Sequence, residues 1–214
     1  MLRAAIACAD EGGIATLTMR SLARVLKVAP MALYRHVANR DDIVDGMVDI
    51  VFSEIDLPLA GPDWQVVMRQ RAISVRGALA AHPWAIGLME SRTNPGPANL
   101  RHHDAVIGSL RSAGFPIGMA AHAYSVLDSY IYGFAMQQRS LPFESPDEIA
   151  AVAQNMLKQF PTGTYPYLAE IMFEHVLQPG YAYEHEFRLG LDLILDGLQR
   201  TRDGVRPSIA SPIN

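Results

Sequence analysis

The chain has 214 residues, half of them hydrophobic and 19% charged, which is typical of a globular protein with a buried core and excludes broad disorder. No apolar run reaches the roughly 18 residues that a bilayer-spanning helix needs, and the first residues do not resemble a signal peptide. The single cysteine, Cys8, excludes a disulfide framework within the chain and a cysteine-rich metal site. We therefore expect a reducing, cytoplasmic setting.

The formal net charge of −4 is unevenly distributed along the chain. Residues 18–40 contain no Asp or Glu and carry +5, so the rest of the chain carries −9. A basic block on an acidic body is typical of a protein with a small nucleic-acid-binding head, although basic residues on a helix are more often simply solvated. The five basic residues are Arg20, Arg24, Lys27, Arg35 and Arg40.

Local signals predict four short helices in the first 55 residues. Gly12 ends the first, Thr18 is a favourable N-cap for the second, and Pro30 suits the first turn of the third. Asn39 can cap the fourth, with Asp42 three residues further on as a shortened capping box. The predicted helices are 2–11, 19–26, 30–37 and 40–55.

Residues 57–62 interrupt the helical pattern and precede a longer helical region. We find no convincing strand and no internal repeat, so the fold class is all-α. A frayed tail follows Gly204. The predicted helices of this region are 64–82, 84–90, 98–113, 118–139, 146–160, 167–177 and 184–202.

Two short helices joined by a three-residue break, 19–26 and 30–37, have the outline of a helix-turn-helix. Ala23 is small enough to let the two helices cross closely. The second helix would then present its other face to a DNA major groove. Apolar residues that can hold the pair together are Leu22, Leu26, Val28 and Leu33.

The stretch from Thr18 to Asp42 resembles the DNA-binding domain of the TetR family of transcriptional regulators. Its strongest element is Ala-Leu-Tyr-Arg-His-Val at residues 32–37. A looser resemblance, to tetracycline-repressor-like C-terminal domains, rests on His82-Pro83, the helix at 120–136 and the sequence around residues 187–198. One departure is Lys27, since the family usually has Gly there, and a left-handed backbone costs a non-Gly residue about 1 kcal/mol.

The resemblance implies a three-helix DNA-binding domain at 1–46, a helical ligand-binding and dimerisation domain at 47–204 and a flexible tail at 205–214. It also implies which residues contact operator DNA. Phosphate contacts are expected from Arg20, Lys27, Tyr34, His36 and Arg40. Arg35 is expected to contact a guanine edge, and Pro30, Met31 and Ala32 lie on the same face, where Met31 and Ala32 would meet thymine methyl groups.

The C-terminal region is expected to dimerise and to bind a small-molecule effector. The helices 120–136 and 184–200 are the dimer candidates, although the apolar stripe of the second is equally compatible with core inside one chain. That stripe is Phe187, Leu191, Ile194, Leu195 and Leu198. Candidate ligand-binding residues are Trp84, Met89, His122, Tyr124, Tyr130 and Phe134.

Tetracycline itself is not expected as the effector, because Met89 stands where a drug-binding histidine of the family would be. Adjacent helical residues point about 100° apart, so His102 and His103 are not expected to share a metal ion, and the histidines are expected at the surface or at helix ends. We expect no catalytic residue, metal or cofactor. Two alternatives stay open: a helical ligand-binding or enzyme-like bundle with a vestigial helix-turn-helix, and a non-specific DNA-binding protein.

Overall fold

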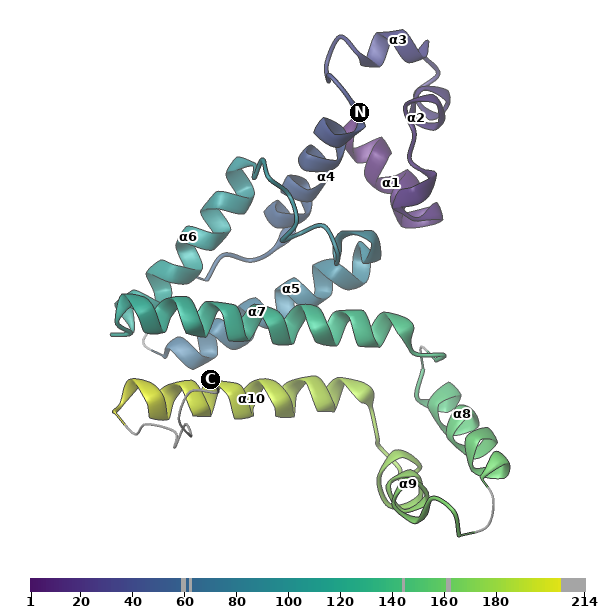
Figure 1. Ribbon diagram of the computed structural model, residues 1–214, viewed down its shortest axis with the longest axis vertical. Helices are drawn as coiled ribbons and strands as arrows, with labels where there is room; N and C mark the ends of the chain where they lie inside the picture. The colour runs from purple at the N-terminus through teal and green to yellow at the C-terminus, as the bar shows by residue number, and fades with distance from the viewer. Residues whose placement is uncertain (59–60, 62, 144, 161–162, 205–214) are drawn as a thin grey trace, which may run out of the picture.

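The computed structural model describes residues 1–58, 61, 63–143, 145–160 and 163–204, and every regular element within them is a helix (Figure 1). The all-α prediction is therefore confirmed. The predicted tail at 205–214 lies outside the described residues. In the described part of the chain, no helix is both long and apolar enough to cross a membrane.

Three short helices form a small head at one end of the molecule (Figure 1). They are α1 (Leu2–Gly12), α2 (Met19–Val25) and α3 (Pro30–Leu33), with the 3-10 turn η1 (Ile14–Thr16) between the first two. Thr18 caps α2 as predicted: its Oγ1 accepts a hydrogen bond from the Ser21 N–H at 3.0 Å, and Ser21 Oγ accepts one from the Thr18 N–H at 2.8 Å. Ile6, Leu22 and Leu33 are buried in the common core of the head.

The turn between α2 and α3 contains the only non-glycine residue with positive φ among the described residues, Lys27 at φ 54°. The Lys27 N–H bonds to the Arg24 carbonyl at 3.1 Å and the Val28 N–H to the Ala23 carbonyl at 3.0 Å. This pair of bonds is a Schellman motif, which requires a left-handed residue and normally takes Gly. Lys27 therefore occupies a strained position that fixes the crossing of α2 and α3.

Replacing Lys27 with Gly is expected to raise the free energy of unfolding by up to about 1 kcal/mol. The relief of left-handed strain, about 1–2 kcal/mol, is partly offset by the greater freedom of Gly in the unfolded chain. Urea unfolding measures the change. Lys27→Ala is the matched control, because it removes the same charge but keeps the Cβ atom. If Lys27→Ala raised the free energy of unfolding as much as Lys27→Gly, the proposed backbone strain at residue 27 would be contradicted.

Helix α4 (Arg40–Glu54) runs uninterrupted from the head into the body (Figure 1). Asn39 caps it as predicted, since its Oδ1 accepts from the Asp42 N–H at 3.0 Å. The predicted division after residue 46 falls inside this helix and stays a prediction. Because one rigid helix belongs to both parts, a displacement of its C-terminal half is transmitted to the head.

The body consists of α5 (Trp64–Ala81), α6 (Pro97–Ser112), α7 (Ile117–Ser140) and α10 (Tyr183–Arg202). Helices α7 and α10 lie side by side and antiparallel, while α8 (Pro146–Gln159), α9 (Pro166–Ile171) and the π-helical turn η3 (Met172–Val176) project beyond the end of α7 (Figure 1). The α7–α10 layer is thus the long face of the body opposite the head.

Three predicted helices differ from the structure. The predicted 30–37 helix is α-helical only to Leu33 and is followed by turns at residues 34–36. The predicted 84–90 helix is a 3-10 turn, η2 (Pro83–Ala85), followed by further turns. The predicted 167–177 helix changes from α to π geometry at Met172.

Candidate DNA interface and ligand site

Helix α3 and the turn that follows it carry six of the nine predicted DNA-contacting residues. Leu33 is buried and anchors α3 on the head core, whereas Met31 is 75% and Tyr34 47% exposed. Exposed apolar side chains of this size on a short helix are suited to contacts in a groove. Of the nine predicted residues, Arg20, Lys27, Pro30, Met31, Tyr34, Arg35 and His36 are exposed, and Ala32 and Arg40 are half-buried.

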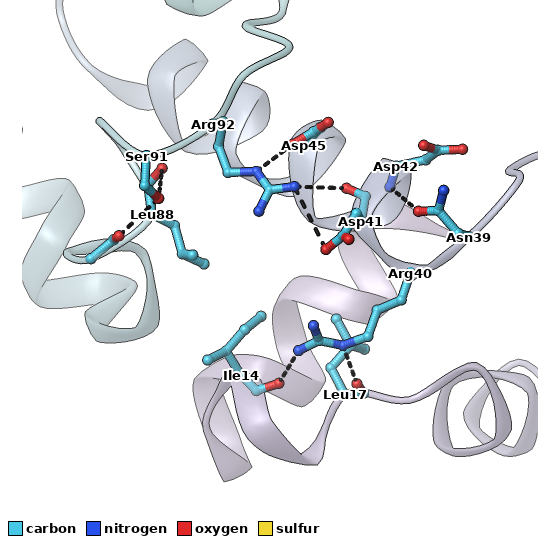
Figure 2. Close-up of polar contacts among 11 residues, drawn as sticks. Ile14, Leu17, Asn39, Arg40, Asp41, Asp42, Asp45, Leu88, Ser91 and Arg92 are labelled. Atoms are coloured by element: carbon cyan, nitrogen blue, oxygen red, sulfur yellow. Dashed lines mark hydrogen bonds and ion pairs between the residues drawn. The ribbon is translucent and has the colours of Figure 1, made fainter.

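Arg40 also has a structural role in the head (Figure 2). Its Nε donates a hydrogen bond to the Leu17 carbonyl and its Nη2 donates one to the Ile14 carbonyl, both at 2.7 Å. These bonds tie the start of α4 to the segment that leads into α2. These bonds use two of the five guanidinium N–H groups and leave three for a phosphate, so Arg40 positions the head whether or not it contacts DNA.

The segment after η2 is linked to the same end of α4 through Arg92 (Figure 2). Its Nε donates to Asp45 Oδ1, and its Nη2 lies 3.7 Å from Asp41 Oδ1. One turn further along α4, Asp49 Oδ1 accepts from the backbone N–H groups of Ala98 at 2.8 Å and Asn99 at 2.9 Å, which caps α6. Helix α4 is therefore held to the body along most of its length.

Trp84, one of the residues predicted to bind ligand, joins the head to the body. Its Nε1 donates to Asp10 Oδ1 of α1 at 2.7 Å. The His82 ring is bonded to Asp10 through Nδ1 and to Glu54 of α4 through Nε2, both at 2.8 Å. Burial lowers the pKa of His82, but the hydrogen bonds to these two carboxylates outweigh it and raise the pKa above its ordinary value of 6.5.

This head–body joint is expected to be pH-dependent. The stability that protonated His82 contributes is fully present below the unfolded pKa of about 6.5 and is lost as the pH rises through the raised folded pKa. Unfolding of the wild type and of His82→Gln in urea, compared from about pH 6 to pH 8.5, should give a free-energy difference that shrinks with rising pH. A free-energy difference that stays constant or grows with rising pH would contradict the stabilising role of protonated His82.

A cluster of buried polar side chains lies between α5, α6 and α7. Arg71 of α5 is 1% exposed and its Nη1 lies 2.5 Å from Asp128 Oδ1 of α7. Its Nε donates to His102 Nε2 of α6 at 3.4 Å. Burial, followed by the nearby Arg71 charge, lowers the pKa of His102 to about 3, so its ring is neutral. Since Nε2 accepts, the proton of the neutral ring lies on Nδ1.

Apart from the ion pair, three atoms of Arg71, His102 and Asp128 have no hydrogen-bond partner among the described residues, namely Arg71 Nη2, His102 Nδ1 and Asp128 Oδ2, and neither has Asn99 Oδ1, one turn before His102 on α6. Leaving such groups unpaired in a protein interior costs free energy, and an unpaired buried group requires an explanation. Two of these four atoms are donors and two are acceptors. The cluster is therefore equipped to bind a polar molecule that is complementary to it.

The other predicted ligand residues are dispersed. Met89 is fully buried, and Tyr124 lies near the polar cluster, with the Arg71 guanidinium 5.9 Å from its ring centroid. His122 is exposed, whereas Tyr130 and Phe134 pack with α10. The expectation that histidines lie at the surface or at helix ends is wrong for His102, which has no exposed surface.

Sequence reasoning missed Arg71 and Asp128, although a signal was present. Arg71 continues the apolar stripe of α5 at helical spacing after Trp64, Val67 and Met68. Asp128 stands beside Leu127 in the buried stripe of α7. Opposite charges on two core-facing stripes predict a buried ion pair.

A small helical head with an exposed basic helix, carried by a helical body with a buried polar site, defines the class of ligand-responsive transcriptional regulators. Residues 57–202 match the family described as the tetracyclin repressor-like C-terminal domain. The chain therefore belongs to the TetR family of transcriptional regulators.

Individual relatives are similar over different lengths. An HTH-type transcriptional regulator of Saccharopolyspora erythraea is 34% identical over 134 residues, which are 62% of this chain and 57% of that protein. The class A tetracycline repressor protein from transposon 1721 of Escherichia coli is 29% identical over 209 residues, 96% of this chain and 92% of that protein. The crystal structure of ActR from Streptomyces coelicolor in complex with actinorhodin has a TM-score of 0.77 at 27% identity, covering 94% of this chain and 95% of that one.

Proposed function

We propose that the chain represses transcription as a homodimer on operator DNA and that a small molecule bound at the buried polar cluster releases it. The E. coli relative is a repressor by name, and ActR was solved with actinorhodin bound. Repression of this kind involves no catalysis, and we expect it to take place in the cytoplasm, where the operator DNA lies. The proposal rests most directly on the contact between His102 of the polar cluster and Phe52 of α4.

The DNA side of the proposal is supported by charge and exposure together. The exposed residues of α3 and its flanking turns are basic, apolar or aromatic, and residues 18–40 contain no acid that would repel phosphate. Phosphate contacts from Arg20 and Lys27 would set the position of the head, and Arg35 would contact a base edge.

The four unpartnered atoms indicate the chemistry of the effector. Oxygen acceptors would pair with Arg71 Nη2 and with the N–H at His102 Nδ1, and hydroxyl groups would donate to Asn99 Oδ1 and Asp128 Oδ2. An oxygen-rich molecule with both carbonyl and hydroxyl groups meets these requirements. Arg71 also borders a hollow of about 780 Å³ between α5 and residues 55–58, which offers an approach from solvent.

Helix α4 is the element that an effector would move. The Phe52 ring of α4 packs on His102 and His103, with centroids 5.4 Å and 5.6 Å apart. A ligand that displaces His102 must therefore shift Phe52, and α4 carries the shift to the head. Two heads spaced for successive major grooves would then miss one of them. By linkage, operator DNA must weaken effector binding by the same factor.

The dimer proposal rests on the outer face of α7 and α10. The stripe predicted as a dimer candidate is core within the chain, because Phe187, Leu191, Leu195 and Leu198 are buried. The opposite side of α10 exposes Leu189 at 59% and Leu193 at 63%. On α7, small residues that permit close helix approach are exposed at helical spacing, namely Ala121, Ser125, Ser129 and Gly133.

Selection of bound duplexes from a random pool tests the repressor role, and the selected site then serves in release assays. We expect a two-fold symmetric site with half-sites about 34–36 Å apart. Actinorhodin and related polycyclic aromatic compounds are then titrated into the operator complex. Release by any of them should be lost in the variant Arg71→Met with Asp128→Leu, which uncharges the cluster. Release that persists in that variant would contradict the effector site, and absence of enrichment would contradict the repressor role.

A further inference from the structure

A second pocket, of about 610 Å³, lies between the C-terminal ends of α5 and α7 and the first turns of α8 and α10. Neither Arg71, His102 nor Asp128 lines it, so it is separate from the buried polar cluster. Its volume is in the range of pockets that hold small molecules. Much of its wall is apolar, including Leu79, Ile86, Leu141 and Ile149.

Two arginines line this pocket without an acidic partner. Arg76 donates from Nε to Gln138 Oε1 at 3.0 Å, and Arg139 donates from Nη1 to the Pro83 carbonyl at 2.9 Å. Among the described residues, neither forms an ion pair with a carboxylate. The acid in the wall, Glu184, is held by Arg188 at 2.6 Å. Glu184 also attracts Arg76, but the lining residues comprise two arginines and one acid, so the described wall carries a net positive charge.

Aromatic rings lie in the wall of the same pocket and next to its Arg76. The Arg76 guanidinium lies 5.0 Å from the Phe187 ring centroid and 5.6 Å from that of Phe134, which holds this cation in place. Phe134 stacks on Tyr183 with centroids 5.0 Å apart. Tyr183 and Phe143 line the pocket, so they can pack on an aromatic occupant.

We propose that this pocket binds a small aromatic acid, whose anionic group pairs with Arg76 and Arg139 and whose ring packs on Tyr183 and Phe143. Charge-assisted bonds to guanidinium are the strong polar contacts available in such a site. The occupant would touch Pro83, which lies between His82 and Trp84. It would therefore contact the segment that joins the body to the head.

Two fluorescent probes test the proposal on the full chain: anilinonaphthalene sulfonate, and phenylnaphthylamine, which has the same rings without the sulfonate. We expect the sulfonate probe to bind at a saturable site. Arg139→Gln should weaken it about tenfold, as expected for the loss of one charged contact, and leave phenylnaphthylamine unchanged. Ala80→Trp, which places a bulky side chain in the pocket wall, should abolish binding of both probes at this site.

Arg101→Gln is the matched control, because Arg101 is an exposed arginine of α6 outside the pocket. It should leave the affinities of both probes unchanged, and circular dichroism should report the same helix content in all variants. Equal affinity of the sulfonate probe for the wild type and Arg139→Gln would overturn the proposal. So would full binding to Ala80→Trp, since the probe would then lie elsewhere.

Discussion

Replacing Asp128 with Asn is expected to lower the free energy of unfolding by about 3–5 kcal/mol. Arg71, 1% exposed, would then retain its charge in the interior without an anionic partner. The penalty for an isolated buried charge exceeds what the ion pair itself contributes, because both groups already lost their hydration on folding. Equilibrium unfolding in urea, monitored by circular dichroism, measures the change.

The exposed ion pair between Arg69 and Asp192 provides the matched control. Its charged atoms are 2.7 Å apart, against 2.5 Å in the buried pair, but its side chains are 36% and 50% exposed. Asp192→Asn should therefore change stability by less than about 1 kcal/mol. The double variant Arg71→Met with Asp128→Leu should recover much of the loss, since no unpaired charge remains. A loss for Asp128→Asn no larger than that for Asp192→Asn would contradict the buried pair.

Arg35→Ala is expected to reduce the preference for operator over scrambled duplex by about 1–3 kcal/mol, between fivefold and 150-fold. Arg35 is exposed on the outward side of the head, where a bidentate contact to guanine would be lost. Affinity for scrambled DNA should change little in comparison. Fluorescence anisotropy with both duplexes at one salt concentration gives the two affinities.

Arg40→Ala provides the comparison that distinguishes loss of a base contact from loss of the correct position of the head. Its bonds to the Leu17 and Ile14 carbonyls hold α4 to the rest of the head, so their loss should weaken binding to both duplexes similarly. An equal loss on both duplexes for Arg35→Ala would show that Arg35 contributes only to general affinity.

Local signals in the sequence predicted the head well because its structure is determined locally. Thr18, Pro30 and Asn39 act where their side-chain chemistry places them, at helix starts. The strain at Lys27 was also expected, since a turn that normally takes Gly needs a left-handed backbone. The short extent of α3, which gives way to turns after Leu33, was not predicted from the local pattern.

The ligand site proposed from the structure differs from the residues chosen from the sequence, because it depends on contacts between distant parts of the chain. Aromatic and Met residues were chosen for a pocket, but Trp84 holds the head and Phe134 packs on α10. The buried polar cluster joins Arg71, His102 and Asp128 from three helices. Helical spacing indicates that Arg71 and Asp128 face the core, but only the fold determines that they face each other.

The relative affinity of the full chain for its selected site and for scrambled duplex, measured at several salt concentrations, tests the central claim most directly. The account predicts a clear preference for the selected site, with affinities that fall steeply as salt rises. Equal, weak binding to both duplexes at modest salt would contradict the assignment of α3 as a base-contacting helix.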